Sequence, residues 1–258
     1  MNNITFNSFD LQDSTYYSRI AKHRGLAQKN VITEDQTRRD GFRIVRSELK
    51  SKIITVEGVM KAKTTAALRV AEDNLKQNLR GNDKNLDIDD GGTTKRYKAT
   101  VQRLSIPGED FYHITHLPYR IEFLCHPKCT ATSATTVEDN NITSSPHTDS
   151  FSITGSASPL PVITLTIDAE STMSVIKFKN TTTDTEITIT RAFSAAEELE
   201  IDCENLTVKV DGTEVDFTGV FPEFDPDTNE YTITTTDGGA FNIDMDIVYY
   251  PTYLWQEN

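Results

Sequence analysis

The last long strand of the chain constrains the fold most. From Phe241 to Tyr249, apolar residues occupy every second position, and Asn242, Asp244 and Asp246 lie between them. A period of two residues places alternate side chains on opposite faces of an extended strand. One face of this strand is therefore apolar and the other polar, which is typical of an antiparallel strand that covers a core on one side. The pattern predicts a β-sandwich.

The residues before this strand have the same character. Short apolar runs at 199–202 and 206–210 flank a polar turn, and further alternating runs occur at 161–167, 175–179 and 186–190. Turn-forming residues separate these runs, as expected for an all-β domain. We predict that this sandwich domain covers residues 157–258.

The first half contains one helix among strands. Leu68, Ala71, Leu75 and Leu79 recur at helical spacing between 65 and 80. Thr64 or Thr65 can cap the start of this helix, and Gly81 follows its end. Strands are predicted at 4–11, 52–60, 85–88, 96–106 and 116–125. We predict an α+β domain over residues 1–150.

Two segments carry few apolar residues. The polar stretch at about 12–46 is predicted to be an extended arm or a long loop with short strands. The Ser/Thr-rich stretch at about 131–160 is interpreted as a linker. Alternation around Phe151 and Ile153 also fits a strand belonging to either domain.

Charge divides the chain in the same place. The net charge is −13; residues 1–130 carry 22 Lys and Arg against 16 Asp and Glu, and residues 131–258 carry 4 against 23. A split this large favours two domains. An acidic chain lacks the charge for generic binding to nucleic acid or anionic membrane, so neither partner is expected.

Cysteine content and the amino-terminal residues indicate where the chain folds. Three cysteines do not make a disulfide scaffold, which favours a reducing cytosol. The start at Met1 has no basic stretch followed by an apolar one, and no apolar run approaches the ~20 residues of a membrane span. We expect neither a signal peptide nor membrane insertion.

The pattern closest to a metal site is Cys125-His126-x-x-Cys129, with His113 and His116 upstream. Thiolates and imidazoles are zinc ligands, but this spacing matches no common zinc finger. We favour a buried Cys125 at a strand end, with His126 and Cys129 at the domain edge. No metal is predicted, and a metal-dependent enzyme using residues 113–129 is the weakest alternative.

Paired carboxylates offer a second metal hypothesis. Asp87, Asp89 and Asp90, or Asp225 and Asp227, supply the oxygen ligands that calcium prefers. Aspartate is also common in turns because its side chain bonds the local backbone. We favour the turn interpretation at both places.

Exposed aromatic residues on the sandwich are candidates for stacking on a sugar. The candidates are Phe193, Phe217, Phe221, Phe224 and Trp255. We expect Phe217, Phe221 and Phe224 to close one end of the core instead. Tyr250, Tyr253 and Trp255 are predicted to anchor the terminal strand or to contact a partner or glycan.

Catalytic signatures are lacking in the sequence. Neither a phosphate-binding Gly-x-x-x-x-Gly-Lys loop, a Gly-x-Ser-x-Gly elbow, a His-Glu-x-x-His pair nor a Gly-x-Gly-x-x-Gly turn occurs. The chain is predicted not to be an enzyme, and no cofactor is expected.

Four motifs in order resemble the carboxy-terminal domain of the distal tail protein (Dit) family of siphophages. They are Ile201–Val208 ("IDCENLTV"), Phe221–Pro226 ("FPEFDP"), Asn229–Ile233 ("NEYTI") and Tyr250–Leu254 ("YPTYL"). The first half is similar to the family's amino-terminal domain in its strand, helix, and strands ending in Phe123–Pro127 ("FLCHP"). The resemblance implies a sandwich of the galectin or carbohydrate-binding-module type after an α+β domain.

The resemblance also implies a function. Six copies would form a ring through the amino-terminal domain at the distal end of a virion tail. The ring would contact the major tail tube protein and the tail-associated hub protein, and the sandwich would dock receptor-binding proteins or side fibres. The alternative is a carbohydrate-binding module attached to an α+β domain.

Overall fold

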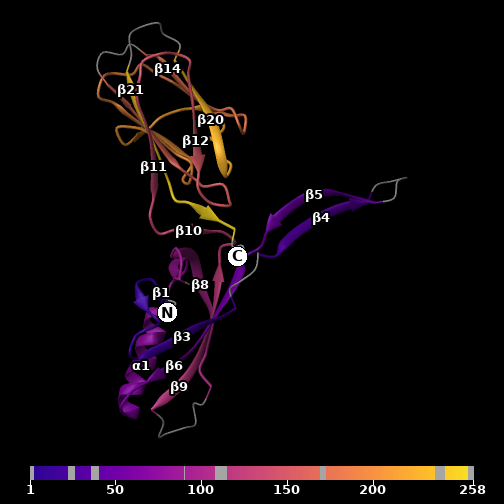
Figure 1. Cartoon of the computed structure of the whole chain (residues 1–258), viewed down its shortest axis with the longest axis vertical. Coiled ribbons are helices and arrows are strands. Elements are labelled where there is room, and N and C mark those ends of the chain that lie inside the picture. The colour runs from indigo at the N-terminus through magenta and orange to yellow at the C-terminus, as the bar shows by residue number, and fades with distance from the viewer. Residues whose placement is uncertain are drawn as a thin grey trace. The chain divides into compact units, whose positions relative to one another are not determined.

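A computed structural model describes residues 3–22, 27–35, 41–89, 91–107, 115–168, 173–235 and 242–254. The chain divides into two compact units (Figure 1). Unit 1 comprises Met1–Thr132 with Leu254–Asn258, and unit 2 comprises Ser133–Tyr253. The predicted boundary at about 150 therefore lies inside unit 2.

Unit 1 is built on an antiparallel sheet with the strand order β2-β1-β7-β8-β9-β6-β3, and β10 also pairs with β8. The strands are β1 (Asn3–Phe6), β2 (Phe9–Asp10), β3 (Tyr16–Lys22), β6 (Lys52–Lys61), β7 (Lys84–Asp89), β8 (Lys95–Ser105), β9 (His116–Cys125) and β10 (Cys129–Ala131). Apart from the first, the strands predicted in this half are confirmed within two residues.

Among the described residues there is one helix, α1 (Thr65–Asn78), which packs on this sheet by one face. Leu68, Ala71 and Leu75 are buried, and the Thr64 side chain accepts a hydrogen bond from the backbone N–H of Ala67. The predicted apolar stripe and cap are confirmed. Among the described residues, no helix is long and apolar enough to cross a membrane.

Two predictions for the first half need correction. Residues 4–11 form β1 and β2 rather than one strand, because Asn7 and Ser8 adopt left-handed backbone angles that reverse the chain. The arm predicted at about 12–46 is shorter, since β3 pairs with β6 along the edge of the sheet. A separate two-stranded ladder remains, made of β4 (Lys29–Asp35) and β5 (Phe42–Leu49).

Unit 2 consists of two antiparallel sheets. The six-stranded sheet has the order β11-β21-β13-β16-β17-β18, and the five-stranded sheet has the order β12-β20-β14-β15-β19. The strands of these sheets are β11 (Thr135–Ile142), β12 (His147–Ile153), β13 (Val162–Ile167), β14 (Val175–Asn180), β15 (Thr185–Thr190), β16 (Glu198–Asp202), β17 (Thr207–Val210), β18 (Thr213–Glu214), β19 (Thr218–Gly219), β20 (Asp227–Thr235) and β21 (Ile243–Tyr249). The short strand β22 (Thr252–Tyr253) follows and belongs to neither sheet.

The two sheets share one core. Ile163, Leu165 and Ile167 of the first sheet and Ile176 and Phe178 of the second are fully buried members of the same hydrophobic cluster. In β21, Ile243, Met245, Ile247 and Tyr249 are buried, as the period of two predicts. Phe241 lies outside the described residues.

The predicted linker at about 131–160 is wrong. This segment forms β11 and β12, which are the edge strands of the two sheets, and Phe151 and Ile153 are buried in the core. Within these strands Thr136, Thr148, Ser150 and Ser152 occupy exposed positions, where β-branched threonine is well tolerated. Composition alone therefore suggested a flexible segment where the alternation indicated a strand.

Candidate interaction surfaces

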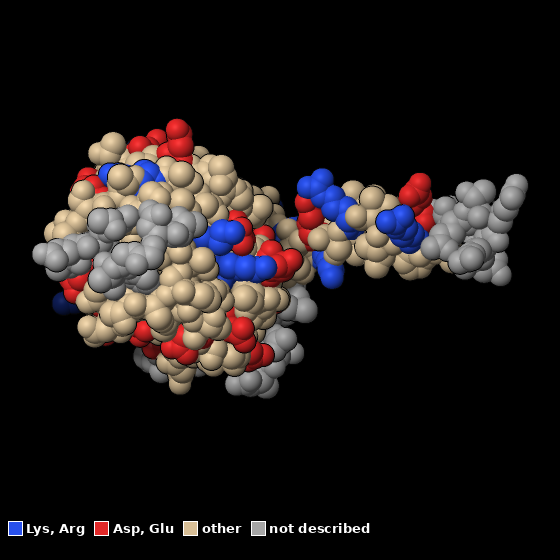
Figure 2. All heavy atoms as spheres, turned by 90° about the horizontal axis from the view of Figure 1, so that it is seen from above, with Lys and Arg blue, Asp and Glu red and all other residues tan. Residues whose placement is uncertain are grey.

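The β4–β5 ladder is the most exposed apolar element of unit 1. Neither strand pairs with any other described strand. Five of its apolar side chains are 44–62% exposed: Val31, Ile32, Phe42, Ile44 and Val45. Charged side chains of both signs lie among uncharged ones along the ladder (Figure 2). An isolated hairpin is marginally stable in water, so this one needs a partner surface to bury its apolar residues.

Local sequence explains why these residues form a ladder. Val31, Ile32, Ile44 and Val45 are β-branched, which favours extended backbone. The register pairs Val31 with Ser47 and Thr33 with Ile44, with an irregularity between Ile32 and Thr33. The polar composition of this segment indicated an arm, and only its β-branched clusters, Val31–Ile32 and Ile44–Val45, signal the exposed apolar residues.

The predicted contact residues at the carboxy terminus have different environments. Tyr250 is 50% exposed, and Tyr253 is partly buried in β22. Trp255 lies outside the described residues. Backbone N–H groups of Ser156 and Ala157 donate to the Thr252 carbonyl at 2.9 and 3.1 Å, which fixes this end of unit 2.

The Cys125-His126-x-x-Cys129 pattern does not assemble into a site. Cys125 and Cys129 are each 1% exposed, and burial raises the pKa of the Cys125 thiol to about 12. His126 is exposed, and its Nε2 lies 3.4 Å from an Asp83 carboxylate oxygen. Cys125 is buried at the end of β9 and His126 is exposed beyond it, so the two side chains have different surroundings.

The other members of that pattern give no support to a metal site. His116 begins β9, nine residues before Cys125, which is about 30 Å along an extended strand. His113 lies outside the described residues. Cys129, expected at the domain edge, is buried, because β10 pairs with β8 and carries it inward.

The paired carboxylates form hydrogen bonds with the backbone and with other side chains. Both carboxylate oxygens of Asp87 accept from the Arg96 guanidinium at 2.8 Å, and Asp89 accepts from the Gly91 N–H at 2.9 Å. Asp90 lies outside the described residues. The turn at 225–227 is held by buried Asn229, whose amide bonds the backbone of Asp225 and Asp227. The turn interpretation agrees with this geometry.

Most of the aromatic candidates pack in or against the core of unit 2. Phe193 and Phe224 are buried in the core, and Phe221 packs partly against it. Phe217 is 37% exposed, with its ring centroid 5.0 Å from that of Phe221. The carbohydrate-binding alternative stays a prediction, and within the described residues it rests on Phe217.

Comparison with known proteins now identifies unit 2. Residues 154–253 match the family model of the siphovirus-type tail component, C-terminal domain. This chain carries a siphovirus-type tail component domain. The predicted resemblance to the distal tail protein family is confirmed. No curated protein sequence matches the chain.

One solved structure shows the same fold over nearly the whole chain. The Dit protein (gp 19.1) of phage SPP1 matches with a TM-score of 0.75 and 15% identity, covering 98% of this chain and 100% of that one. That protein is described as a paradigm of hub adsorption apparatus in Gram-positive infecting phages. A chain of the phage P2 baseplate in its activated conformation with Ca matches at 7% identity and a TM-score of 0.47, covering 96% of this chain and 97% of that one; at this TM-score it carries no argument. The domain and the fold support a structural role in a phage tail.

Proposed function

We propose that this protein is the distal tail component of a siphophage and acts as a ring-shaped adaptor. Six copies assemble through unit 1 at the distal end of the virion tail. The ring joins the major tail tube protein to the tail-associated hub protein. Unit 2 docks receptor-binding proteins or side fibres, with Tyr250 and Tyr253 as contacts. The role is mechanical, and the residues serve binding rather than catalysis.

The exposure of the β4–β5 ladder is the main support for the proposed ring. Five apolar residues of the ladder are each 44–62% exposed, and a closed ring gives each copy the same neighbouring surface to cover them. The edge strand β3 adds unpaired backbone groups that a neighbouring copy can also cover. Unit 2 needs no such cover, because its two sheets bury their core against each other.

The test compares assembly of the full chain with assembly of ladder variants. Mass photometry and negative-stain imaging are expected to show particles of six chains with a central opening. Ile44→Asp and Phe42→Asp place charges at the proposed contact and should shift the particles to single chains. Both residues are exposed in the single chain, so folding by circular dichroism should not change.

Leu206→Asp is the matched control. Leu206 is an exposed apolar residue of unit 2 with a left-handed backbone, which aspartate tolerates. This variant should assemble as the unmodified chain does. A full chain that stays single at all concentrations, or ladder variants that still form rings, would contradict the proposal.

A further inference from the structure

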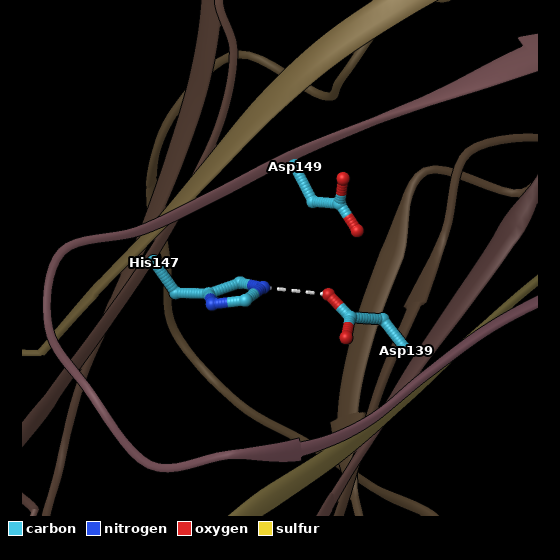
Figure 3. A group of neighbouring side chains, drawn as sticks. All are labelled: Asp139, His147 and Asp149. Carbon is cyan, nitrogen blue, oxygen red and sulfur yellow. Dashed lines mark hydrogen bonds and ion pairs between the residues drawn. The ribbon is translucent and has the colours of Figure 1, made fainter.

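Three metal-ligating side chains meet at one open edge of the unit 2 sandwich. Asp139 comes from β11, and His147 and Asp149 come from β12 (Figure 3). One candidate ligand atom from each residue lies within 4.8 Å of the others. β11 is the edge strand of the six-stranded sheet and β12 that of the five-stranded sheet, so the cluster bridges the two sheets.

The register shows that all three side chains occupy inward positions. Asp139 pairs with Met245 on β21, which is fully buried. On the other sheet, His147 pairs with Ile233 and Asp149 with Tyr231, and both partners are 1% exposed. Directly paired residues of an antiparallel ladder share a face. Ionisable residues therefore stand where the alternation of both strands would place apolar ones, and such breaks of the pattern mark functional sites.

The local contacts leave an acidic, partly enclosed site. His147 Nε2 lies 2.7 Å from Asp139 Oδ2, and the same oxygen accepts a hydrogen bond from the Tyr231 hydroxyl. Burial and the neighbouring Asp139 raise the pKa of Tyr231, so its hydroxyl stays a donor. The side chains of His147 and Asp139 are only 24% and 16% exposed. Two carboxylates and one imidazole thus lie close together (Figure 3).

We propose that Asp139, His147 and Asp149 form a binding site for a divalent transition-metal ion, with Zn²⁺ as the best fit. One imidazole nitrogen and two carboxylate oxygens are ligand types that zinc accepts. Ligands about 2.0–2.1 Å from zinc lie roughly 3.3 Å apart in a tetrahedron, so small side-chain rotations suffice. Calcium fits less well, because it takes about 6–8 oxygen ligands.

A bound ion would act as a clamp between the sheets. Coordination by both carboxylates would offset the repulsion between them. The ion would also link β11 and β12, which belong to different sheets and do not pair with each other. Asp149 is exposed, so the remaining coordination positions are open to water. This site is independent of the proposed ring, since none of its residues belongs to unit 1.

The experiment titrates the full chain, freed of metal by chelation, with Zn²⁺ alone by calorimetry. We expect a single ion per chain and a rise in the melting temperature of unit 2. Asp149→Asn and His147→Gln should each weaken Zn²⁺ binding by at least about tenfold, because the first replaces an anionic ligand with a neutral amide and the second removes the imidazole. Co²⁺ added in place of Zn²⁺ should give visible absorption that both substitutions reduce.

Glu138→Gln is the matched control, since Glu138 neighbours Asp139 but is exposed at an outward position of β11. It should bind Zn²⁺ as the unmodified chain does. Asp149 is exposed, so its amide variant should fold even if the histidine variant does not. Absence of Zn²⁺ binding, or binding that Asp149→Asn leaves unchanged, would overturn the proposal.

Discussion

At the scale of single residues, Gly58 shows how one position fixes the sheet of unit 1. It lies in β6 between Ser18 of β3 and Tyr119 of β9. The hydroxyls of Ser18 and Tyr119 are 2.5 Å apart, so the tyrosine ring reaches across Gly58. A Cβ at Gly58 would lie 2.5 Å from Tyr119 Cζ and 2.8 Å from the Tyr17 carbonyl oxygen.

Gly58→Ala is therefore expected to destabilise unit 1 by about 1–3 kcal/mol through overpacking. The carbonyl of Tyr17 belongs to a paired strand and cannot move away freely. The change in the free energy of unfolding is measured by urea denaturation, with hydrogen exchange in β3, β6 and β9 as the readout. Gly92→Ala is the control, because nothing lies within 4 Å of a Cβ there. Equal stability of the two variants would show that the tyrosine ring yields.

The three cysteines give a second test at this scale. Burial raises the pKa of Cys125 and Cys203 to about 12 and raises that of Cys129. The thiolate is the reactive form, so all three should resist a thiol reagent at pH 8 until the chain unfolds. A thiol that reacts in the native chain would show that its burial is incomplete.

The same shifts predict an alkaline limit. The folded state holds these thiol protons more tightly than the unfolded state, in which the ordinary thiol pKa is 9.0. Their contribution to stability is complete below that value and is lost as the pH rises toward about 12. Alkaline unfolding should therefore begin above pH 9.

At the scale of elements, β21 organises unit 2. It pairs with β11 on one side and β13 on the other, and its buried side chains face the core between the sheets. Ile247 is fully buried and pairs with Val137 and Ile163. Its neighbour Asp246 is exposed on the opposite face.

Ile247→Asp should unfold unit 2 and spare unit 1. An unpaired buried charge costs several kcal/mol, against the ~5–15 kcal/mol that stabilises a domain. Limited proteolysis should then cleave within 133–253 and leave residues 1–132 resistant. Asp246→Ser, next in sequence, should keep both units resistant. If residues 133–253 of Ile247→Asp stay resistant to the protease, the side chain of Ile247 does not face the core.

At the scale of the whole molecule, the position of the unit boundary decides which fragments fold. Unit 2 begins at Ser133, and its edge strands β11 and β12 contribute Ile142, Phe151 and Ile153 to the core. A fragment that starts at 157 lacks both strands. It would expose the edges of β20 and β21 together with the apolar side chains they cover.

We expect residues 133–253 to be a soluble, cooperatively folding monomer and residues 157–253 to aggregate or unfold. The net negative charge of this half also opposes self-association. Size-exclusion chromatography and thermal melting of the two fragments distinguish these outcomes. Equal stability of the shorter fragment would show that β11 and β12 are peripheral to the core.

The sequence by itself determined the local structure and the faces that become buried. The Leu68, Ala71 and Leu75 stripe gave α1 its packed side, and the alternation in 243–249 gave β21 its inward one. These patterns are local, because the helix and strand periods act within about ten residues. The order of four short motifs also pointed to the family that the comparison confirmed.

Only the tertiary structure decided which strands pair and what they bring together. His147 pairs with Ile233, and Asp139 with Met245, across long stretches of chain that no local period can specify. The segment predicted as a linker therefore forms the edge strands β11 and β12. The cluster of Asp139, His147 and Asp149 lies where these two strands approach each other. The exposure of the β4–β5 ladder followed in the same way, because burial depends on the surrounding surfaces rather than on the strand itself.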